Sequence, residues 1–377
     1  MPVELESIAQ KFRVDGEFLS ARPYRSGHIN DTYLVVLKRG GQPVPHIFQR
    51  INHHVFKKPP QLMDNIIRIT GHIRAKLIST GATDPARRVL TVIPTKEQRN
   101  YYLDRESHYW RAYMFITGAQ TYNTPISNEQ AFQATFAFGK FQEMLLDLPG
   151  TPLHETIPNF HNAPIRFHEF RQALKNDRFG RAKAAKPEID FLLEQAGLFD
   201  TLSGLVKGGK IPVRITHNDT KVNNVMLDDE TGEGICIVDL DTVMPGLSLY
   251  DFGDLARTTL CDAAEDERDL QKVEINLSRF EAIAKGYLTA ASGFLKKTEI
   301  AHLLTGAKMM TLLIGMRFLT DFLEGDHYFK IQREDHNLDR CRVQFKLVRS
   351  LIKHEQEITD LIRVVKKKCG IGVNHRP

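Results

Sequence analysis

Apolar and polar residues alternate in the first third of the chain in a pattern typical of a small sheet with one long helix. Runs rich in β-branched and aromatic residues predict strands at residues 18–24, 32–37, 46–51, 89–94 and 110–116. After Pro59 and Pro60, apolar residues instead recur at every third or fourth position, which predicts a helix to about Ser79, before Gly81.

A second group of apolar runs lies in the middle of the chain. Residues 213–216 and 235–238 are short and apolar, which predicts two strands. Residues 224–227 continue the first of them, and residues 228–232 have the composition of a hairpin turn. We therefore expect a small sheet to hold the polar segment 217–223.

This polar segment places Asp219 five residues before Asn224, and Asp239 ends the next apolar run. In phosphoryl transfer, an Asp on such a loop accepts the proton of the attacking hydroxyl, while an Asn and a second Asp hold Mg²⁺. Asp219 is therefore the expected catalytic base, in contact with the substrate, and Asn224 and Asp239 are the expected metal ligands. The alternative is that His217 and Asp219 only cap a turn. The two flanking runs and the correctly placed second acid disfavour it.

Two other motifs resemble nucleotide sites but lack the required context. Residues 204–210 match the start of a P-loop, yet Ile211 stands where Ser or Thr must bind Mg²⁺, and no strand precedes them. We expect a flexible turn there. Residues 251–253 spell Asp-Phe-Gly, the metal motif of protein kinases, but they lie too far from the loop and open a helical pattern.

The order of elements predicts an α+β fold with two lobes, like that of protein kinases. A small mixed sheet with one long helix comes first, and helices around the catalytic hairpin follow a crossover at Gly118. We expect residues 1–117 to form a nucleotide-binding lobe and residues 118–377 to form a larger, mainly helical catalytic and substrate-binding lobe.

The turn between the first two strands is expected to lie over the phosphates of ATP, because its backbone N–H groups and hydroxyls can donate to phosphate oxygens. The expected nucleotide-binding residues are Ser26, Gly27, Asn30 and Thr32 in this turn, Gln49 on the third strand, and Met114 and Ile116 before the crossover.

One part of the kinase pattern is missing. The third strand usually presents a Lys to the phosphates, paired with a Glu on a helix, but here it offers only Gln49 or Arg50, and the helix at 59–79 has no Glu. Arg50 is no simple substitute, because its planar fork binds phosphate differently from an ammonium group.

Composition fits a two-lobed enzyme, since the chain has 377 residues, of which 42% are hydrophobic. The net charge of +5 is mild, and no basic stripe with interleaved aromatic residues suggests a nucleic-acid partner. Four scattered cysteines favour free thiols and a cytoplasmic location. No long apolar run or leader-like start suggests a membrane partner or export.

Several segments together resemble the N-acetylhexosamine 1-kinases of the aminoglycoside phosphotransferase family. They are residues 27–33, 48–52, 216–221, 237–242, 315–319, 323–326 and 328–329, and the resemblance runs over nearly the whole chain. It implies transfer of phosphate from ATP, with Mg²⁺, to the anomeric hydroxyl of N-acetylglucosamine or N-acetylgalactosamine. It also implies that His28, Arg317 and Tyr328 bind the sugar, that Asp251 buttresses the catalytic loop, and that Gln49 is compatible with activity.

Two other functions remain open. Another small-molecule kinase could take an aminoglycoside or amino alcohol, because Asp321, Glu324 and Asp326 offer negative charge to an ammonium group. A nucleotide-binding pseudokinase is suggested only by the missing Lys and Glu.

Arg317 lies in an apolar helical segment and must meet a carboxylate or a ligand. Asp321, one turn on, is both its structural alternative partner and a candidate substrate-binding residue. The sequence leaves the choice of epimer and the oligomeric state open.

Overall fold

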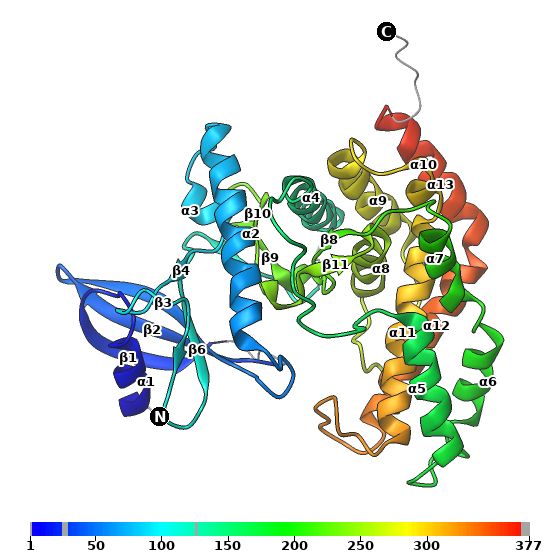
Figure 1. The fold of residues 1–377 in the computed structure, drawn as a ribbon. Coiled ribbons are helices and arrows are strands. Elements are labelled where there is room, and N and C mark those ends of the chain that lie inside the picture. Colours follow the sequence, from blue (N-terminus) through cyan, green and yellow to red (C-terminus); the bar gives the residue numbers. More distant parts are fainter. Residues whose placement is uncertain (1, 25–28, 125–126, 371–377) are drawn as a thin grey trace.

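The computed structural model of this protein describes residues 2–24, 29–124 and 127–370, which form two lobes (Figure 1). The smaller, N-terminal lobe is built around an antiparallel sheet, and the larger, C-terminal lobe is mainly helical. The α+β arrangement in two lobes that the sequence predicts is therefore confirmed.

Among the described residues, six strands form the N-terminal sheet in the order β1-β2-β3-β6-β4, with β5 paired to β6. They are β1 (Glu17–Pro23), β2 (Asp31–Arg39), β3 (Gln42–Ile51), β4 (Val92–Ile93), β5 (Tyr102–Leu103) and β6 (Tyr109–Met114). Gly40 and Gly41 both have positive φ and form the tight turn between β2 and β3. The expected strand at residues 89–94 is reduced to β4 at the sheet edge, and the other expected strands are confirmed.

The helices of this lobe are α1 (Pro2–Ala9), α2 (Pro59–Ser79) and α3 (Pro85–Arg88). Helix α2 has the predicted bounds, and its apolar face is buried at Leu62, Ile66, Ile69 and Ile73. The same hydrophobic cluster includes Phe138 and Val225 of the C-terminal lobe. Helix α2 therefore stands between the sheet and the second lobe, as Figure 1 shows, and ties the two together.

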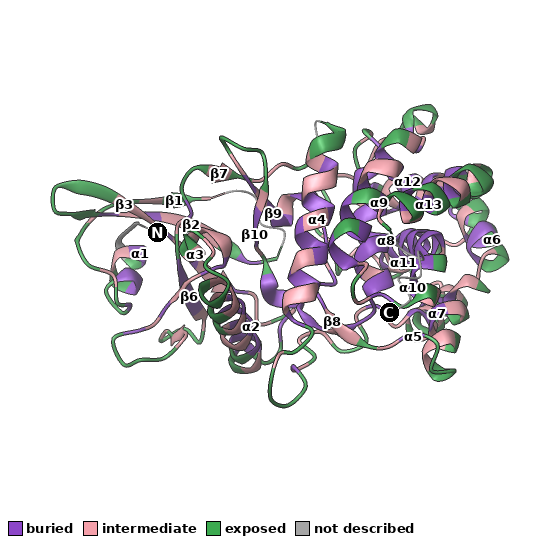
Figure 2. Ribbon diagram, turned by 90° about the horizontal axis from the view of Figure 1, so that it is seen from above, coloured by how far each residue is buried: buried purple, intermediate pink, exposed green. Residues whose placement is uncertain are grey.

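The C-terminal lobe packs its helices around a central buried core, which is purple in Figure 2. Its larger helices are α4 (Asn128–Met144), α5 (Ala163–Asn176), α6 (Lys186–Glu194), α7 (Leu198–Lys207), α8 (Ser248–Thr259), α9 (Leu277–Ala291), α11 (Leu303–Leu323), α12 (His336–Lys353) and α13 (Glu355–Lys368), with the short helix α10 (Lys297–Ala301) before α11. Helix α11 is long and apolar enough to cross a membrane by length and composition, but 83% of its most apolar window is buried inside the protein. Its apolar surface is thus used in the core.

The strands of this lobe are β7 (Ala119–Gln120), β8 (Arg214–Thr216), β9 (Val225–Asp228), β10 (Gly234–Ile237) and β11 (Met244–Gly246), with 3₁₀ turns η1 (Val222–Asn224), η2 (Leu240–Thr242) and η3 (Leu270–Lys272). Strands β9 and β10 form the expected hairpin. Strand β8 pairs instead with β11, so the sequence-based expectation that residues 224–227 extend the first strand is wrong. The polar segment 217–221 and η1 separate the two strands.

Two smaller expectations can also be checked. The prediction of a flexible turn over residues 204–210 is wrong in part, because α7 continues to Lys207 and the turn covers only residues 208–210. The cysteines are free thiols, as expected, at Cys236, Cys261, Cys341 and Cys369.

Candidate active site

One buried carboxylate holds the start of residues 217–224, which the sequence predicts to be the catalytic loop and which keep that name below. Asp251 of α8 accepts hydrogen bonds from the backbone N–H groups of His217 at 2.9 Å and Asn218 at 2.8 Å. The Thr220 hydroxyl donates to the backbone oxygen of Asp251 at 2.6 Å. Burial raises the pKa of Asp251 to about 7, although the loop N–H groups oppose this shift. The expectation that Asp251 buttresses the loop is confirmed.

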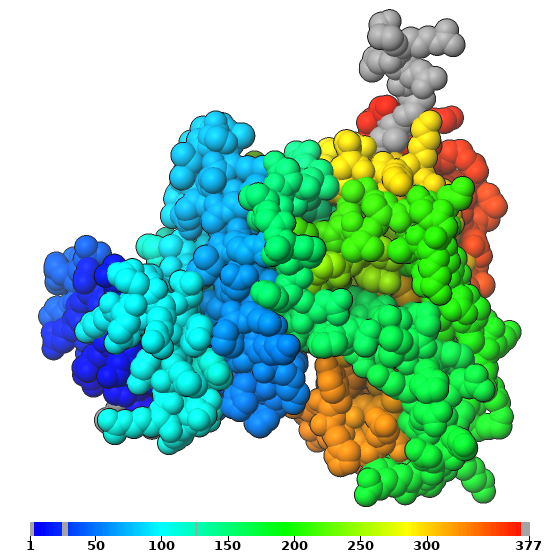
Figure 3. All heavy atoms as spheres, in the orientation of Figure 1, coloured from blue at the N-terminus to red at the C-terminus, as the bar shows by residue number. Residues whose placement is uncertain are grey.

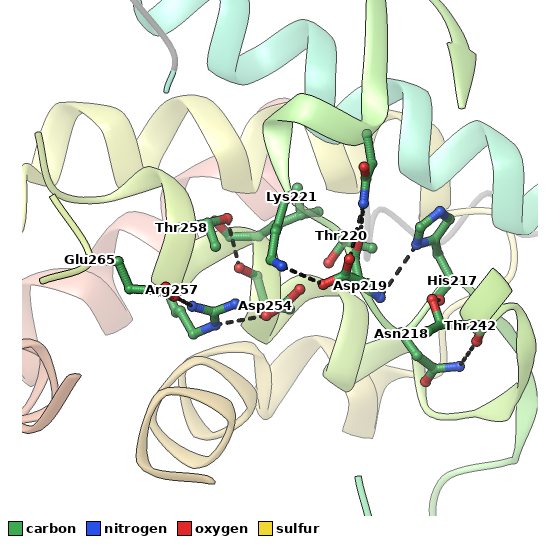
Figure 4. A network of polar contacts seen from close by, with 12 residues as sticks. His217, Asn218, Asp219, Thr220, Lys221, Thr242, Asp254, Arg257, Thr258 and Glu265 are labelled. Atoms are coloured by element: carbon green, nitrogen blue, oxygen red, sulfur yellow. Dashed lines mark hydrogen bonds and ion pairs between the residues drawn. The ribbon is translucent and has the colours of Figure 1, made fainter. Parts of the chain in front are cut away.

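Asp219 lies at the middle of the loop and is only partly buried. Its Oδ1 forms an ion pair with Nζ of Lys221 at 3.0 Å, and Figure 4 shows Lys221 directed toward it. Nδ2 of Asn224 donates to the backbone oxygen of Asp219 at 2.8 Å and to Oδ2 at 3.2 Å. Burial raises the pKa of Asp219, but Lys221 and His217 outweigh it, so the net shift is downward. Asp219 is thus an ionised carboxylate that can accept a hydroxyl proton.

Asp239 follows β10 in the left-handed conformation, with φ of 57°, and its side chain is exposed. Desolvation by the surrounding protein, together with the carboxylates of Asp241 and Asp219, raises its pKa. Such a surplus of negative charge suits a divalent cation. The backbone N–H of Val238 donates to the backbone oxygen of Asn224 at 2.9 Å, which holds the two expected metal ligands next to each other.

These residues fit Mg²⁺ in particular. Among the described residues, no group of three or more His, Cys, Asp or Glu side chains could hold a metal ion. Mg²⁺ needs fewer protein ligands, because it keeps several waters and takes further oxygens from substrate phosphates. Both side-chain hydrogen bonds of Asn224 use Nδ2, so its side-chain oxygen is the atom that it can offer the cation.

On the N-terminal lobe, the sequence-predicted phosphate turn is described only from Ile29 onward, so Ser26, Gly27 and His28 lie outside the described residues. Thr32 accepts a hydrogen bond from Nε2 of Gln49 at 2.9 Å. The other candidate on β3, Arg50, forms an ion pair with Asp31 of β2 at 2.6 Å.

A buried arginine that the sequence did not indicate faces this region from β6. Arg111 donates from Nε to Oε1 of Gln49 at 2.9 Å. Its Nη1 and Nη2 donate to Oδ1 and Oδ2 of Asp241 at 2.5 and 2.9 Å. Asn30, from the phosphate turn, donates to Oδ2 of the same carboxylate at 2.6 Å. The two lobes are thus joined by a charged contact next to Asp239.

The segment before the crossover presents two different faces. The Met114 side chain is 49% exposed, whereas Ile116 is buried in the core shared by the two lobes. Ile116 can therefore meet a nucleotide only through its backbone, while Met114 offers its side chain.

The expected sugar-binding residues Arg317 and Tyr328 lie together in the C-terminal lobe. Nη2 of Arg317 donates to the Tyr328 hydroxyl at 3.2 Å. The guanidinium lies 5.0 Å from the ring centroid of Phe160, 5.4 Å from that of Tyr328 and 5.6 Å from that of Phe329. Among the described residues, Arg317 forms no ion pair. It is a cation held by aromatic faces, which is a stable arrangement for a guanidinium.

Asp321 does not serve as the partner of Arg317. Its carboxylate accepts hydrogen bonds from the backbone N–H groups of His327, Tyr328 and Phe329 at 2.8 to 2.9 Å. Nδ2 of Asn337 donates to it as well, at 2.9 Å. The expected structural pair one turn apart is therefore not formed, because the following loop takes up the carboxylate. Asp321 shapes the segment that carries Tyr328.

Two further cations lie near Asp219, and each is paired with a carboxylate. Lys221 contacts it, and Arg257 is buried between Asp254 at 2.7 Å and Glu265 at 3.1 Å (Figure 4). Burial lowers the pKa of Arg317, and the charges of Arg166 and Arg257 lower it further.

Figure 3 shows a notch between the lower end of α2, in blue, and the orange part of the C-terminal lobe.

His161 connects this region to the catalytic loop and was not indicated by the sequence. Its Nε2 contacts the backbone oxygen of Asn218 at 2.7 Å, and its ring lies 4.3 Å, between centroids, from that of Phe160. Burial lowers its pKa to about 4. The ring is therefore neutral at pH 7, and only its packing and hydrogen bond support the loop.

The depressed pKa of His161 predicts a pH-dependent loss of stability. A base whose pKa falls from 6.5 to about 4 on folding contributes stability above pH 6.5, and this is lost as the pH falls through 4. The loss amounts to up to about 3 kcal/mol. In urea unfolding, we expect the free energy of unfolding to fall less steeply between these pH values for His161→Gln than for the wild type. Parallel pH profiles for the two proteins would contradict the assignment.

The chain is similar to known phosphotransferases and kinases in sequence and in structure. The model of the phosphotransferase enzyme family matches residues 20–285. An aminoglycoside phosphotransferase from Alicyclobacillus acidocaldarius is similar in structure, with 12% identity and a TM-score of 0.57, over 97% of this chain and 96% of that one. A choline kinase from Cryptosporidium parvum has 14% identity and a TM-score of 0.56, over 96% and 99% of the two chains. A spectinomycin phosphotransferase, bound to ADP and spectinomycin, has 13% identity and a TM-score of 0.52, over 97% and 99%. At these identities, the likeness shows the fold.

Proposed function

The chain belongs to the phosphotransferase enzyme family, and from this premise we propose that it transfers the γ-phosphoryl group of ATP to the anomeric hydroxyl of an N-acetylhexosamine. Family membership makes it a small-molecule phosphotransferase. In our proposal, residues 1–117 bind the nucleotide, and residues 118–377 carry the catalytic loop and the sugar site. The free thiols support a cytoplasmic location, where ATP is abundant.

Asp219 is the proposed base. Its ionised carboxylate would accept the proton of the anomeric hydroxyl as the sugar oxygen attacks the γ-phosphorus, and Lys221 would stabilise the carboxylate before transfer. Asn224 and Asp239 would hold Mg²⁺, which when bound neutralises charge on the phosphate oxygens. The loop is positioned for this by Asp251, so base and metal ligands share one rigid support.

The observation that carries the choice of acceptor is Arg317, which forms no ion pair among the described residues. Arg166 and Arg257 lie close enough to lower the pKa of Arg317, whereas Arg257 is itself paired with Asp254 and Glu265. A guanidinium with free donors can bind sugar hydroxyls or the carbonyl oxygen of an N-acetyl group. The neighbouring aromatic rings of Phe160 and Tyr328 offer flat apolar surface to a sugar. A neutral sugar therefore suits this side of the site better than a cation.

The competing acceptors, aminoglycosides and amino alcohols, carry ammonium groups, which proteins bind with carboxylates or with aromatic faces. The aromatic rings in this region already hold the guanidinium of Arg317. Asp321 is occupied by backbone N–H groups, and Asp326 is held by Arg181 at 2.5 Å and by Asn337 at 2.8 Å. Glu324 alone of the three acids is exposed. Two of the three carboxylates that could bind an ammonium group, Asp321 and Asp326, are thus already paired with groups of the protein.

The function is tested with a panel of acceptors. N-acetylglucosamine, N-acetylgalactosamine, choline, ethanolamine and an aminoglycoside are each incubated with ATP and Mg²⁺, and ADP release is measured. Phosphorus NMR of the product then locates the new phosphate. We expect turnover of the two N-acetylhexosamines with phosphate on the anomeric oxygen. Phosphate on another hydroxyl, or turnover only of a cationic acceptor, would contradict the proposal. No turnover of any acceptor, with ATP bound, would favour the pseudokinase.

Replacing Arg317 tests the sugar site directly. Arg317→Ala is expected to lower kcat/KM for N-acetylhexosamines by about 10² to 10⁴, because it removes two charged hydrogen bonds of about 1.5–3 kcal/mol each. Binding of ADP, measured by calorimetry, should be unchanged. Arg349→Ala is the matched control, since Arg349 also lies over an aromatic ring, that of Phe191 at 3.9 Å, in another part of the lobe. Equal effects of the two variants would remove Arg317 from the sugar site.

A further inference from the structure

We propose that the ion pair of Arg111 and Asp241 replaces the lysine–glutamate pair that this chain lacks, by fixing the metal-binding turn after β10 against the N-terminal lobe. Arg111 is then a positioning residue, which acts through Asp241 on the adjacent Asp239. The inference rests on the proposed function of Asp239 as a metal ligand.

The pair itself is built for rigidity. The two guanidinium nitrogens meet the two carboxylate oxygens at 2.5 and 2.9 Å, and the side chains of Arg111 and Asp241 are only 1% and 2% exposed. Two parallel hydrogen bonds fix the mutual orientation of both groups, which a point-charge ammonium would not do. The partners lie 130 residues apart, one in each lobe, so the pair fixes one lobe relative to the other.

On the N-terminal side, the arginine belongs to a row of polar residues that crosses the sheet. Thr32 of β2 is opposite Gln49 of β3, and Gln49 is opposite Arg111 of β6. Hydrogen bonds of 2.9 Å run from Arg111 to Gln49 and from Gln49 to Thr32. Gln49 thus stands on the strand where a kinase lysine is expected, but it orients a cation on the next strand. The network therefore accounts for a glutamine in place of the lysine expected on the third strand.

On the C-terminal side, the carboxylate belongs to η2, which follows Asp239 directly. The backbone oxygen of Asp241 accepts a hydrogen bond from the hydroxyl of Thr156 at 2.7 Å. The next residue, Thr242, donates from its hydroxyl to the backbone oxygen of His217 at 2.8 Å. The turn is therefore fastened both to the sheet and to the catalytic loop. Asp239, in its left-handed conformation at the start of the turn, has its direction set by these contacts.

Asn30 extends the same network to the phosphate turn. Its Nδ2 donates to Asp241 at 2.6 Å, while its Oδ1 accepts from the backbone N–H of Asn52 at 2.9 Å. The carboxylate of Asp241 therefore links Arg111 of the sheet and Asn30 of the phosphate turn to the metal-binding turn. Loss of the Arg111–Asp241 pair should therefore lower the affinity for nucleotide in the presence of the divalent metal more than it lowers the affinity in its absence.

The test uses the double variant Arg111→Gln/Asp241→Asn, which removes both charges but keeps shape and hydrogen-bonding groups. Neutralising both partners avoids leaving one buried charge unpaired, which would by itself destabilise the protein by about 3–5 kcal/mol. Calorimetry measures the affinity for ADP with and without Mn²⁺, a Mg²⁺ analogue, in the full-length protein without acceptor. We expect the gain in affinity from Mn²⁺ to fall about tenfold or more, as for other residues that orient metal ligands. The affinity for ADP alone should stay within about twofold of the wild type.

The matched control is Arg87→Gln/Asp228→Asn. This ion pair, at 2.8 Å, also joins α3 to the C-terminal lobe, but it lies beside the crossover, where Arg87 also bonds the backbone oxygens of Thr117 and Gly118. It should change the melting temperature and leave the Mn²⁺-dependent gain intact. A full gain in the folded Arg111→Gln/Asp241→Asn variant, as judged by circular dichroism, would overturn the inference. A wild type without any Mn²⁺-dependent gain would instead overturn the proposed metal site, and the inference with it.

Discussion

The Asp219→Asn variant is expected to bind ATP like the wild type and to turn over about 10² to 10⁴ times more slowly, the usual contribution of a positioned acid–base group. Asparagine keeps the size of the side chain and an oxygen that can face Asn224, but it cannot accept a proton. The affinity for ADP and the melting temperature, measured on the same preparation, serve as controls for the fold and the nucleotide site. Turnover within a few-fold of the wild type would remove Asp219 from the mechanism.

This large effect is expected because the structure gives Asp219 few other tasks. Its carboxylate contacts Lys221 and Asn224, whereas the support of the loop comes from Asp251. Loss of its charge should therefore affect the reaction and leave the position of the loop unchanged. kcat should fall with little change in KM for ATP, since the removed interaction matters at the transition state.

The second large effect is expected for Asp239→Asn, which should lower Mg²⁺-dependent turnover by about 10² to 10³, since a bound cation supplies several kcal/mol of charge stabilisation. Asparagine is chosen because it tolerates the left-handed backbone of this position. Its melting temperature should not fall, because the side chain is exposed and replacing it relieves repulsion from the neighbouring carboxylates. Titration of Mg²⁺ at saturating ATP measures the effect.

Asp251→Ala is the contrasting variant. It leaves the buried N–H groups of His217 and Asn218 without an acceptor, at a cost of about 1–3 kcal/mol each. Its main effect should therefore be a lower melting temperature. If Asp251→Ala instead lost its Mg²⁺ response at full stability while Asp239→Asn stayed active, residues 251–253 would be the metal motif and Asp239 would not be a ligand.

Local patterns in the sequence were sufficient for much of the fold. Strands β1, β2, β3 and β6 and the bounds of α2 follow from the spacing of apolar residues, which backbone geometry translates directly into strand or helix. The same holds for the catalytic hairpin. Asp219, Asn224 and Asp239 lie within 21 residues of one another, around one turn, so their closeness depends on short-range geometry alone.

Only the tertiary structure decided which side chains from distant parts of the chain contact one another. Arg111 meets Asp241 only because β6 pairs with β3 and η2 packs opposite Arg111. No feature of the sequence near Arg111 indicates Asp241 as its partner. Helical spacing made Asp321 the natural partner of Arg317, but the loop after α11 supplies N–H groups that satisfy this carboxylate first. Periodicity determines which face of an element a side chain occupies. Which group it meets there depends on how the elements pack, and packing is a property of the whole chain.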